Sequence, residues 1–257
     1  MSANPASIVA DGVSTSTVTL QARDVAGNNT SFSGQTVTFS TTSGTLGTVT
    51  DNGDGTYSAI LTSSTTAGNA TVTGTIDGES VVDDATVTFT PGPASAANTT
   101  LTAAPLSITA DGVTTSTVTV QAIDANGNAL TSGGDAIVLA TTAGTLSNIT
   151  DNGDGTYSAT LTSSTTAETA SISGTVNGTD ITDTASVEFV PGDASAATST
   201  ITATPSSITA DGTSNTTITV QAKDANGNNL TAGGDTVSLS SNAGTLSNFA
   251  DNGDGTY

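Results

Sequence analysis

One short stretch decides the fold because its side chains alternate between polar and apolar: Thr117-Val118-Thr119-Val120-Gln121-Ala122. Side chains that alternate in this way lie on opposite faces of a β-strand, with one face buried and the other solvated. The same alternation returns 100 positions earlier and later, at residues 17–22 and 217–222. Valine and threonine are β-branched and favour strands. The stretch therefore predicts the same half-buried strand three times along the chain.

Other stretches with a period of two surround this strand in the middle of the chain. They begin near Leu101, Ile108, Ile137, Tyr157, Ala170 and Ala185. No segment shows sustained helical spacing, and Asp-Gly, Asn-Gly and Gly-Asn pairs separate the stretches, as turns require. About seven short strands in about 100 residues are typical of an immunoglobulin-like sandwich. The predicted fold class is therefore all-β, with tandem immunoglobulin-like β-sandwich domains of about 100 residues each.

The domain organisation follows from a repeat without insertions. The heptapeptide DNGDGTY begins at Asp51, Asp151 and Asp251. Pro-Gly pairs at residues 91–92 and 191–192 mark strand ends, because proline cannot donate to a sheet. We therefore expect repeat 1 at residues 1–92 without its first strand, a complete repeat 2 at 93–192, and a C-terminally truncated repeat 3 at 193–257. We interpret the chain as part of a longer array.

The composition excludes several functions. The formal net charge is -21, from Asp+Glu 23 and Lys+Arg 2, and the chain has no His and no Cys. Without these residues a zinc site of the usual kind, a thiol nucleophile and a Ser-His-Asp triad are all excluded, so we expect no enzymatic activity. Two cations cannot form a basic patch, which argues against nucleic acid and anionic membranes as partners. No apolar run is long enough for membrane insertion.

The aromatic residues are few, and two of them per repeat are expected in the core. No Cys pair and no Trp is present to pin the two sheets together, so we expect aliphatic packing with Tyr57 and Phe89, or Tyr157 and Phe189, to do so. Each of these Tyr residues stands two positions before a strand Ala. This spacing fits a tyrosine corner, in which the hydroxyl bonds to backbone, and it equally fits a plain core aromatic.

Two acidic loops recur in the repeats, and both have a metal alternative. Carboxylates and carbonyls in Asp-Asn-Gly-Asp-Gly, or in residues 124–128 (DANGN), would suit Ca²⁺, which prefers oxygen ligands. Tight turns account for the same residue types, because Gly supplies a positive φ and Asp and Asn bond nearby backbone. We favour turns. The first copy of the second loop, residues 24–28, has Ala26 where the other copies have Asn.

A separate hypothesis concerns the acidic residues near a domain boundary. Asp183 and Asp193 would together hold an interdomain calcium ion that stiffens the chain, and EDTA would then change the melting temperature. Apart from this calcium alternative we expect no cofactor. We assign no catalytic, cofactor-binding or metal-binding residue.

The repeats resemble a known family through two motifs. Residues 208–212 (ITADG) with 217–228 (TITVQAKDANGN), and residues 144–146 (GTL) with 151–162 (DNGDGTYSATLT), look like the bacterial immunoglobulin-like repeats of the invasin/intimin type. The resemblance covers essentially the whole chain. It implies a non-catalytic stalk of a bacterial surface adhesin or secreted repeat protein, which holds a distal binding domain away from the cell.

The resemblance also sets the expected partners and location. Neighbouring repeats of the same chain are the expected partners, with any host or cell-surface ligand bound by other domains, and the location is the extracellular face of a bacterium. The alternative function is a binding module whose loops recognise a glycan or a host protein. Phe32 is the one aromatic residue on a loop of the first copy that favours this alternative.

Overall fold

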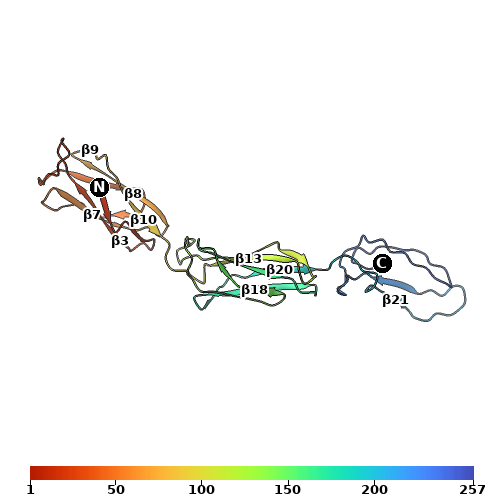
Figure 1. The fold of residues 1–257 in the computed structure, drawn as a ribbon. Coiled ribbons are helices and arrows are strands. Elements are labelled where there is room, and N and C mark those ends of the chain that lie inside the picture. Colours follow the sequence, from red (N-terminus) through yellow and green to blue (C-terminus); the bar gives the residue numbers. More distant parts are fainter.

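The chain forms a row of three β-domains that follow one another end to end (Figure 1). The computed structural model describes residues 1–257. We call residues 1–92, 93–192 and 193–257 domains 1, 2 and 3. All regular elements are strands, and the chain contains no helix of the length and apolarity that a membrane span needs.

Domain 2 is a sandwich of two sheets. The first sheet has the order β11-β13-β17-β15, with β16 also on β17: β11 (Thr100–Ala104), β13 (Thr115–Gln121), β17 (Thr156–Thr162), β15 (Thr145–Leu146) and β16 (Thr150–Asp151). The second has the order β12-β20-β18-β14, with β19 on β18: β12 (Ser107–Thr109), β20 (Ala185–Val190), β18 (Glu168–Val176), β14 (Ile137–Thr141) and β19 (Thr179–Asp180). Only β12 and β20 pair in parallel. This topology confirms the predicted all-β sandwich.

Domain 1 repeats both sheets strand for strand. Its first sheet contains β1 (Ser2–Asn4), β3 (Thr15–Gln21), β7 (Thr56–Thr62), β5 (Thr45–Leu46) and β6 (Thr50–Asp51). Its second sheet contains β2 (Ser7–Val9), β10 (Ala85–Thr90), β8 (Gly68–Ile76), β4 (Val37–Thr41) and β9 (Glu79–Ser80).

The expectation that domain 1 lacks its first strand is wrong. Strand β1 pairs with β3, with Ser2 opposite Thr19, just as Thr102 lies opposite Thr119 in domain 2. A strand of three residues is long enough here because Met1 and Ala3 occupy the positions that Leu101 and Ala103 have in β11. Met1 and Ala3 pack against the core of domain 1. The strand is therefore shortened rather than missing.

Domain 3 contains fewer strands than the other two domains. Strands β21 (Thr200–Thr204) and β22 (Thr217–Gln221) form a two-stranded antiparallel sheet. Its buried apolar cluster consists of Val220, Ala222 and Tyr257 alone. Domain 3 has no counterpart of β18 or β20, which supply much of the core in domain 2, so Ile201 at the open face is 64% exposed.

The core of domain 2 lies between the sheets and is built by the alternating side chains of both. A single cluster of 17 buried residues, all between Leu101 and Phe189, fills it. Tyr157 and Phe189 are each 1% exposed and come from opposite sheets, as expected for the residues that join them. Burial of a Phe or Leu side chain contributes about 1.5–3 kcal/mol. Domain 2 therefore has a core of its own, made without residues of its neighbours.

Candidate functional site

The recurring loop at residues 124–128 is a tight turn organised by its first residue. One carboxylate oxygen of Asp124, Oδ1, accepts the backbone N–H groups of Asn126 (2.9 Å) and Asn128 (2.8 Å). Gly127 has a φ of 86°, which glycine adopts without strain. These contacts are those that the turn interpretation predicts.

The same loop also binds the preceding domain, which the sequence did not predict. The second carboxylate oxygen of Asp124, Oδ2, accepts the N–H of Gly92 at 2.8 Å. The side-chain amide of Asn126 donates to the carbonyl of Ala10 at 3.0 Å. The side-chain amide of Asn128 donates to the carbonyl of Thr65 (2.9 Å) and accepts the N–H of Ala67 (2.8 Å). We call Asp124, Asn126 and Asn128 the junction clamp of domain 2.

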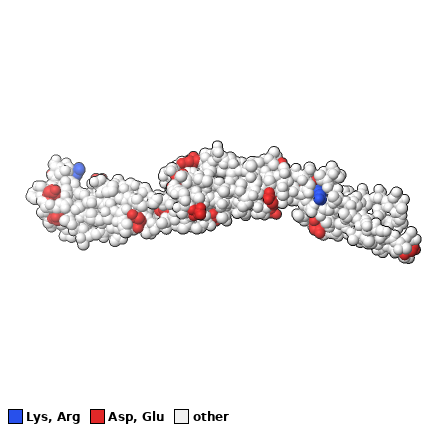
Figure 2. Space-filling view, turned by 90° about the horizontal axis from the view of Figure 1, so that it is seen from below, with Lys and Arg blue, Asp and Glu red and all other residues white.

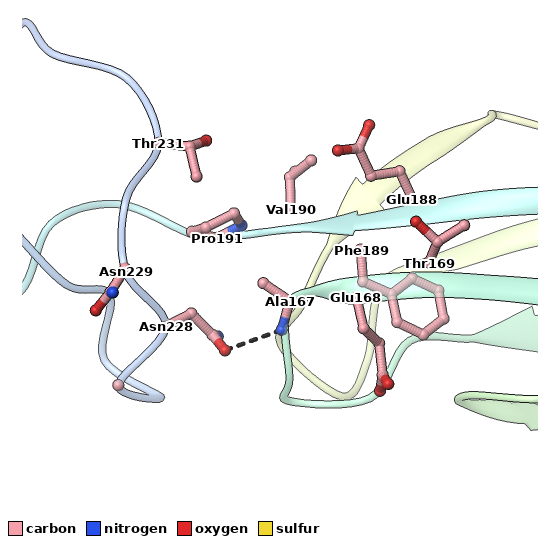
Figure 3. A pocket seen from close by; sticks show the side chains of 11 residues that line it. Ala167, Glu168, Thr169, Glu188, Phe189, Val190, Pro191, Asn228, Asn229 and Thr231 are labelled. Carbon is pink, nitrogen blue, oxygen red and sulfur yellow. Dashed lines mark hydrogen bonds between the residues drawn. The ribbon is translucent and has the colours of Figure 1, made fainter. Parts of the chain in front are cut away.

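Domain 3 binds domain 2 through the same arrangement. Asp224 accepts the N–H of Gly192 at 3.0 Å, and Asn226 donates to the carbonyl of Ala110 at 2.9 Å. Asn228 donates to the carbonyl of Thr165 at 2.9 Å. It also accepts the N–H of Ala167 at 2.9 Å, the bond drawn as a dashed line in Figure 3. In both junctions every bond joins a clamp side chain to a backbone group of the preceding domain. The clamp therefore places no demand on the side chains of that domain.

The clamp carboxylate is buried and fully hydrogen-bonded. Asp124 is 1% exposed, and its two oxygens accept four bonds, the fourth from the side-chain amide of Asn128 at 2.9 Å. Burial alone would raise the pKa of Asp124, but the bonds from Asn128, Gly92 and Asn126 outweigh it and hold the pKa below its usual range. Asp224 follows the same pattern. The carboxylate is therefore ionised near neutral pH, where it accepts these bonds.

The linker before the clamp is tied to domain 2 as well. Ser95 donates its N–H to the carbonyl of Ile123 at 2.7 Å, and Ala94 forms an isolated bridge with Asp124. Thr182 donates its N–H to the carbonyl of Ala96 at 3.2 Å. These contacts hold residues 94–96 against domain 2, next to the loop that contacts domain 1.

Domain 1 retains the turn but only part of the clamp. Asp24 accepts the N–H groups of Ala26 and Asn28, each at 2.9 Å, and its Oδ2 accepts the Asn28 amide at 3.0 Å. Ala26 has no side-chain donor, and Asp24 is exposed. The carboxylate of Asp24 thus has the same local setting as that of Asp124 but lacks the bond from a preceding domain.

The Asp-Asn-Gly-Asp-Gly loop and the Asp11-Gly12 turn are held by hydrogen bonds from backbone N–H groups to their Asp side chains. Asp51 accepts the N–H of Gly53 at 2.9 Å, and Asp54 accepts that of Thr56 at 3.0 Å. Asp11 accepts the N–H groups of Val13 and Ser14, which helps hold its pKa well below the usual range. Nowhere do three or more acidic side chains gather as metal ligands would.

The two acidic residues proposed as an interdomain calcium pair are not brought together. Asp183 precedes strand β20 of domain 2, whereas Asp193 follows that strand and begins domain 3, so the length of β20 separates the two residues. Asp183 instead accepts the N–H of Leu101 and that of Thr184, both at 2.9 Å. The pairing hypothesis is therefore wrong.

The tyrosine hydroxyls bond to backbone, as in a tyrosine corner, but to a distant loop. Asp135 donates its N–H to the hydroxyl of Tyr157 at 2.8 Å, and Gln35 donates to that of Tyr57 at 3.2 Å. The acceptor stands 22 residues after its partner, whereas a tyrosine corner joins residues a few positions apart. Burial raises the pKa of Tyr157, so the hydroxyl stays protonated.

Two shallow grooves flank the linker between domains 2 and 3. One, of about 490 Å³, lies between the ends of β18 and β20 and the loop of domain 3, and includes Glu168, Glu188 and Asn228 (Figure 3). The other, of about 430 Å³, lies between Val190-Pro191 and residues 230–235. The clamp therefore holds the domains together without closing the space on either side.

Fold and junction together define tandem immunoglobulin-like domains that are joined through a recurring polar contact. The family model described as invasin, domain 3, matches each of the three domains, at residues 1–92, 95–192 and 195–257. The chain belongs to this family.

Three solved structures are similar to the chain. InvD of Yersinia pseudotuberculosis is 31% identical with a TM-score of 0.62, over 89% of this chain and 71% of that chain. FdeC, an Escherichia coli adhesin, is 30% identical with a TM-score of 0.61, over 88% and 73%. Invasin, described as a bacterial integrin-binding protein, is 32% identical with a TM-score of 0.57, over 86% of this chain and 46% of invasin. The chain is thus an adhesin module whose relatives are bacterial surface proteins.

Proposed function

We propose that the chain is a non-catalytic spacer of a bacterial surface adhesin, located outside the cell, where it holds a distal binding domain away from the surface. The observation that carries this proposal is the repetition of one clamp. Domains 2 and 3 bind their preceding domains through the same four contacts. The use of the same contacts at both junctions favours a regular arrangement of successive domains, which is what an extended spacer requires.

The surface supports the same role. Acidic side chains are scattered along the length of the chain, whereas the only two basic side chains lie far apart (Figure 2). Like charge repels neighbouring molecules within about 8 Å at physiological salt. The exposed positions of β3 and β13 carry Thr, whose hydroxyl groups keep an elongated molecule soluble. A set of densely displayed spacers would therefore remain separate.

The test places the chain between a bacterial surface anchor and a small binding module of known specificity. We expect capture of beads that carry the target to fall when residues 93–192 are deleted, because the reach shortens by one domain. The labelled chain alone should not bind host cells. Capture that is independent of length, together with saturable binding of the chain alone, would instead support the loop-recognition alternative.

A further inference from the structure

The end of domain 1 that faces away from domain 2 carries the same loop that binds the preceding domain elsewhere in the chain. We infer that this face is a docking surface for the trailing end of another immunoglobulin-like repeat. The inference rests on the proposed spacer function, and it gives the exposed Phe32 a role in packing between domains. We call the surface, made of Asp24, Asn28 and Phe32, the leading face of domain 1.

The polar half of the leading face is already in place. Asp24 and Asn28 hold each other as Asp124 and Asn128 do, through the Asn amide and the loop N–H groups. In domain 2 the same two side chains make three contacts with Gly92, Thr65 and Ala67 of the preceding domain. On domain 1 the corresponding atoms lack these backbone partners. Three of the four clamp contacts therefore remain available.

The kind of partner follows from what the clamp recognises. Both observed junctions contact only backbone N–H and carbonyl groups, at corresponding positions of domains 1 and 2. A partner must therefore present an N–H after the last strand and the backbone of the turn before β8 or β18, in the same geometry. The trailing end of a repeat of this family meets that requirement.

The apolar half of the leading face compensates for the lost Asn. Phe32 occupies the position of Ala232, which lines the groove of about 430 Å³ beside Val190 and Pro191 at the second junction. Phe32 is 75% exposed in the present chain. A phenyl ring there would fill the corresponding groove and pack against the Val-Pro end of the preceding repeat. Ala26 removes one hydrogen bond, and Phe32 supplies apolar burial in its place.

The test uses the full chain preceded by a second copy of residues 93–200, so that Met1 stands where Ile201 stands in the natural sequence. The added domain has its own core, since the 17 clustered residues all lie within it. Hydrogen exchange is followed in residues 24–34, which occur once in the extended chain. We expect their exchange to slow about tenfold relative to the unextended chain, because several hydrogen bonds must open first.

Three variants of the extended chain make the test specific. Asp24→Asn and Phe32→Ala should each return most of the exchange rate to that of the unextended chain. Ile60→Thr is the matched control, because Ile60 is also an exposed apolar residue of domain 1 and Thr160 occupies its place in domain 2. It should leave the slowing unchanged.

The outcomes separate this inference from the proposed function. If residues 24–34 exchange as fast with the added repeat as without it, the leading face does not accept a repeat and the inference is wrong. Phe32 would then be free for a glycan or a host protein. Residues 224–228 report on the natural junction in the same experiment. Fast exchange there as well would show that the clamps do not hold, and the spacer proposal would fail with it.

Discussion

The interior of a domain and the junction between domains are built from opposite chemistry. Inside domain 2, 17 apolar residues pack between two sheets. Single side chains such as Phe189 contribute to the stability of the domain through the apolar surface area that they bury. At the junction three polar side chains bind backbone groups around one buried carboxylate. Core packing sets the stability of each domain, whereas the clamp sets its orientation. The two properties should therefore respond to different substitutions.

The largest expected effect is in the core. Phe189→Ala should destabilise domain 2 by about 3–5 kcal/mol, because it removes a fully buried ring and leaves a cavity. Phe89→Ala is the matched change in domain 1. Differential scanning calorimetry should show one transition shifted in each variant, and a different one in each case. A uniform shift of all transitions would mean that the domains do not unfold as separate units.

Acid should act on turns and clamps together. Hydrogen bonds hold the pKa of Asp11, Asp54, Asp124 and their counterparts below the usual value of about 3.9 for unfolded chains. A group whose pKa is lower in the folded state than in the unfolded state stabilises the fold at pH values above its unfolded pKa. This stabilisation is lost as the pH falls through its folded pKa. The melting temperature should be constant from pH 7 to about pH 5 and should fall steadily below about pH 4. Stability that rises on acidification would contradict the assignment.

A single clamp substitution should have a smaller and local effect. Asp124→Asn keeps the turn acceptor but replaces the oxygen that binds Gly92 with a donor, so the junction should lose about 1–3 kcal/mol. Asp24→Asn makes the same change where no preceding domain is present. NMR should show faster exchange of the Gly92 amide in the first variant only. If Asp124→Asn speeds exchange of the Gly92 amide no more than Asp24→Asn does, the Asp124 carboxylate matters for its own turn alone.

The smallest effect is expected at the tyrosine. Tyr157→Phe removes the acceptor of the Asp135 N–H and should cost about 1 kcal/mol. Chemical denaturation of the unchanged chain, of Tyr157→Phe and of the matched Tyr57→Phe variant measures this loss of stability. An unchanged midpoint would show that Tyr157 acts as a core aromatic only.

The sequence predicted the domains well because burial imposes a period of two. The alternation in residues 117–122 corresponds to β13, and the other six predicted stretches correspond to the longer strands of domain 2. The two-residue strands β15, β16 and β19 are too short for an alternation to appear. The shortened β1 was missed because only Met1 and Ala3 carry its pattern.

The junction could not be predicted from the pattern within one repeat. Asp124 and its neighbours satisfy a turn completely, so nothing in the loop indicated that the same carboxylate has a second set of partners. One signal was present in the comparison of copies. Asn126 and Asn226 recur at a loop position where the turn itself needs only a backbone N–H, as Ala26 in the first copy shows.

The most direct test of the clamp is a distance distribution between domains 1 and 2. The chain has no Cys, so Thr38→Cys and Val138→Cys, both at exposed strand positions, can be spin-labelled uniquely. A fixed orientation predicts one narrow distance peak, which should broaden when Asp124→Asn and Asn128→Ala are added. A distribution that is already broad in the chain with its clamp intact would contradict the account.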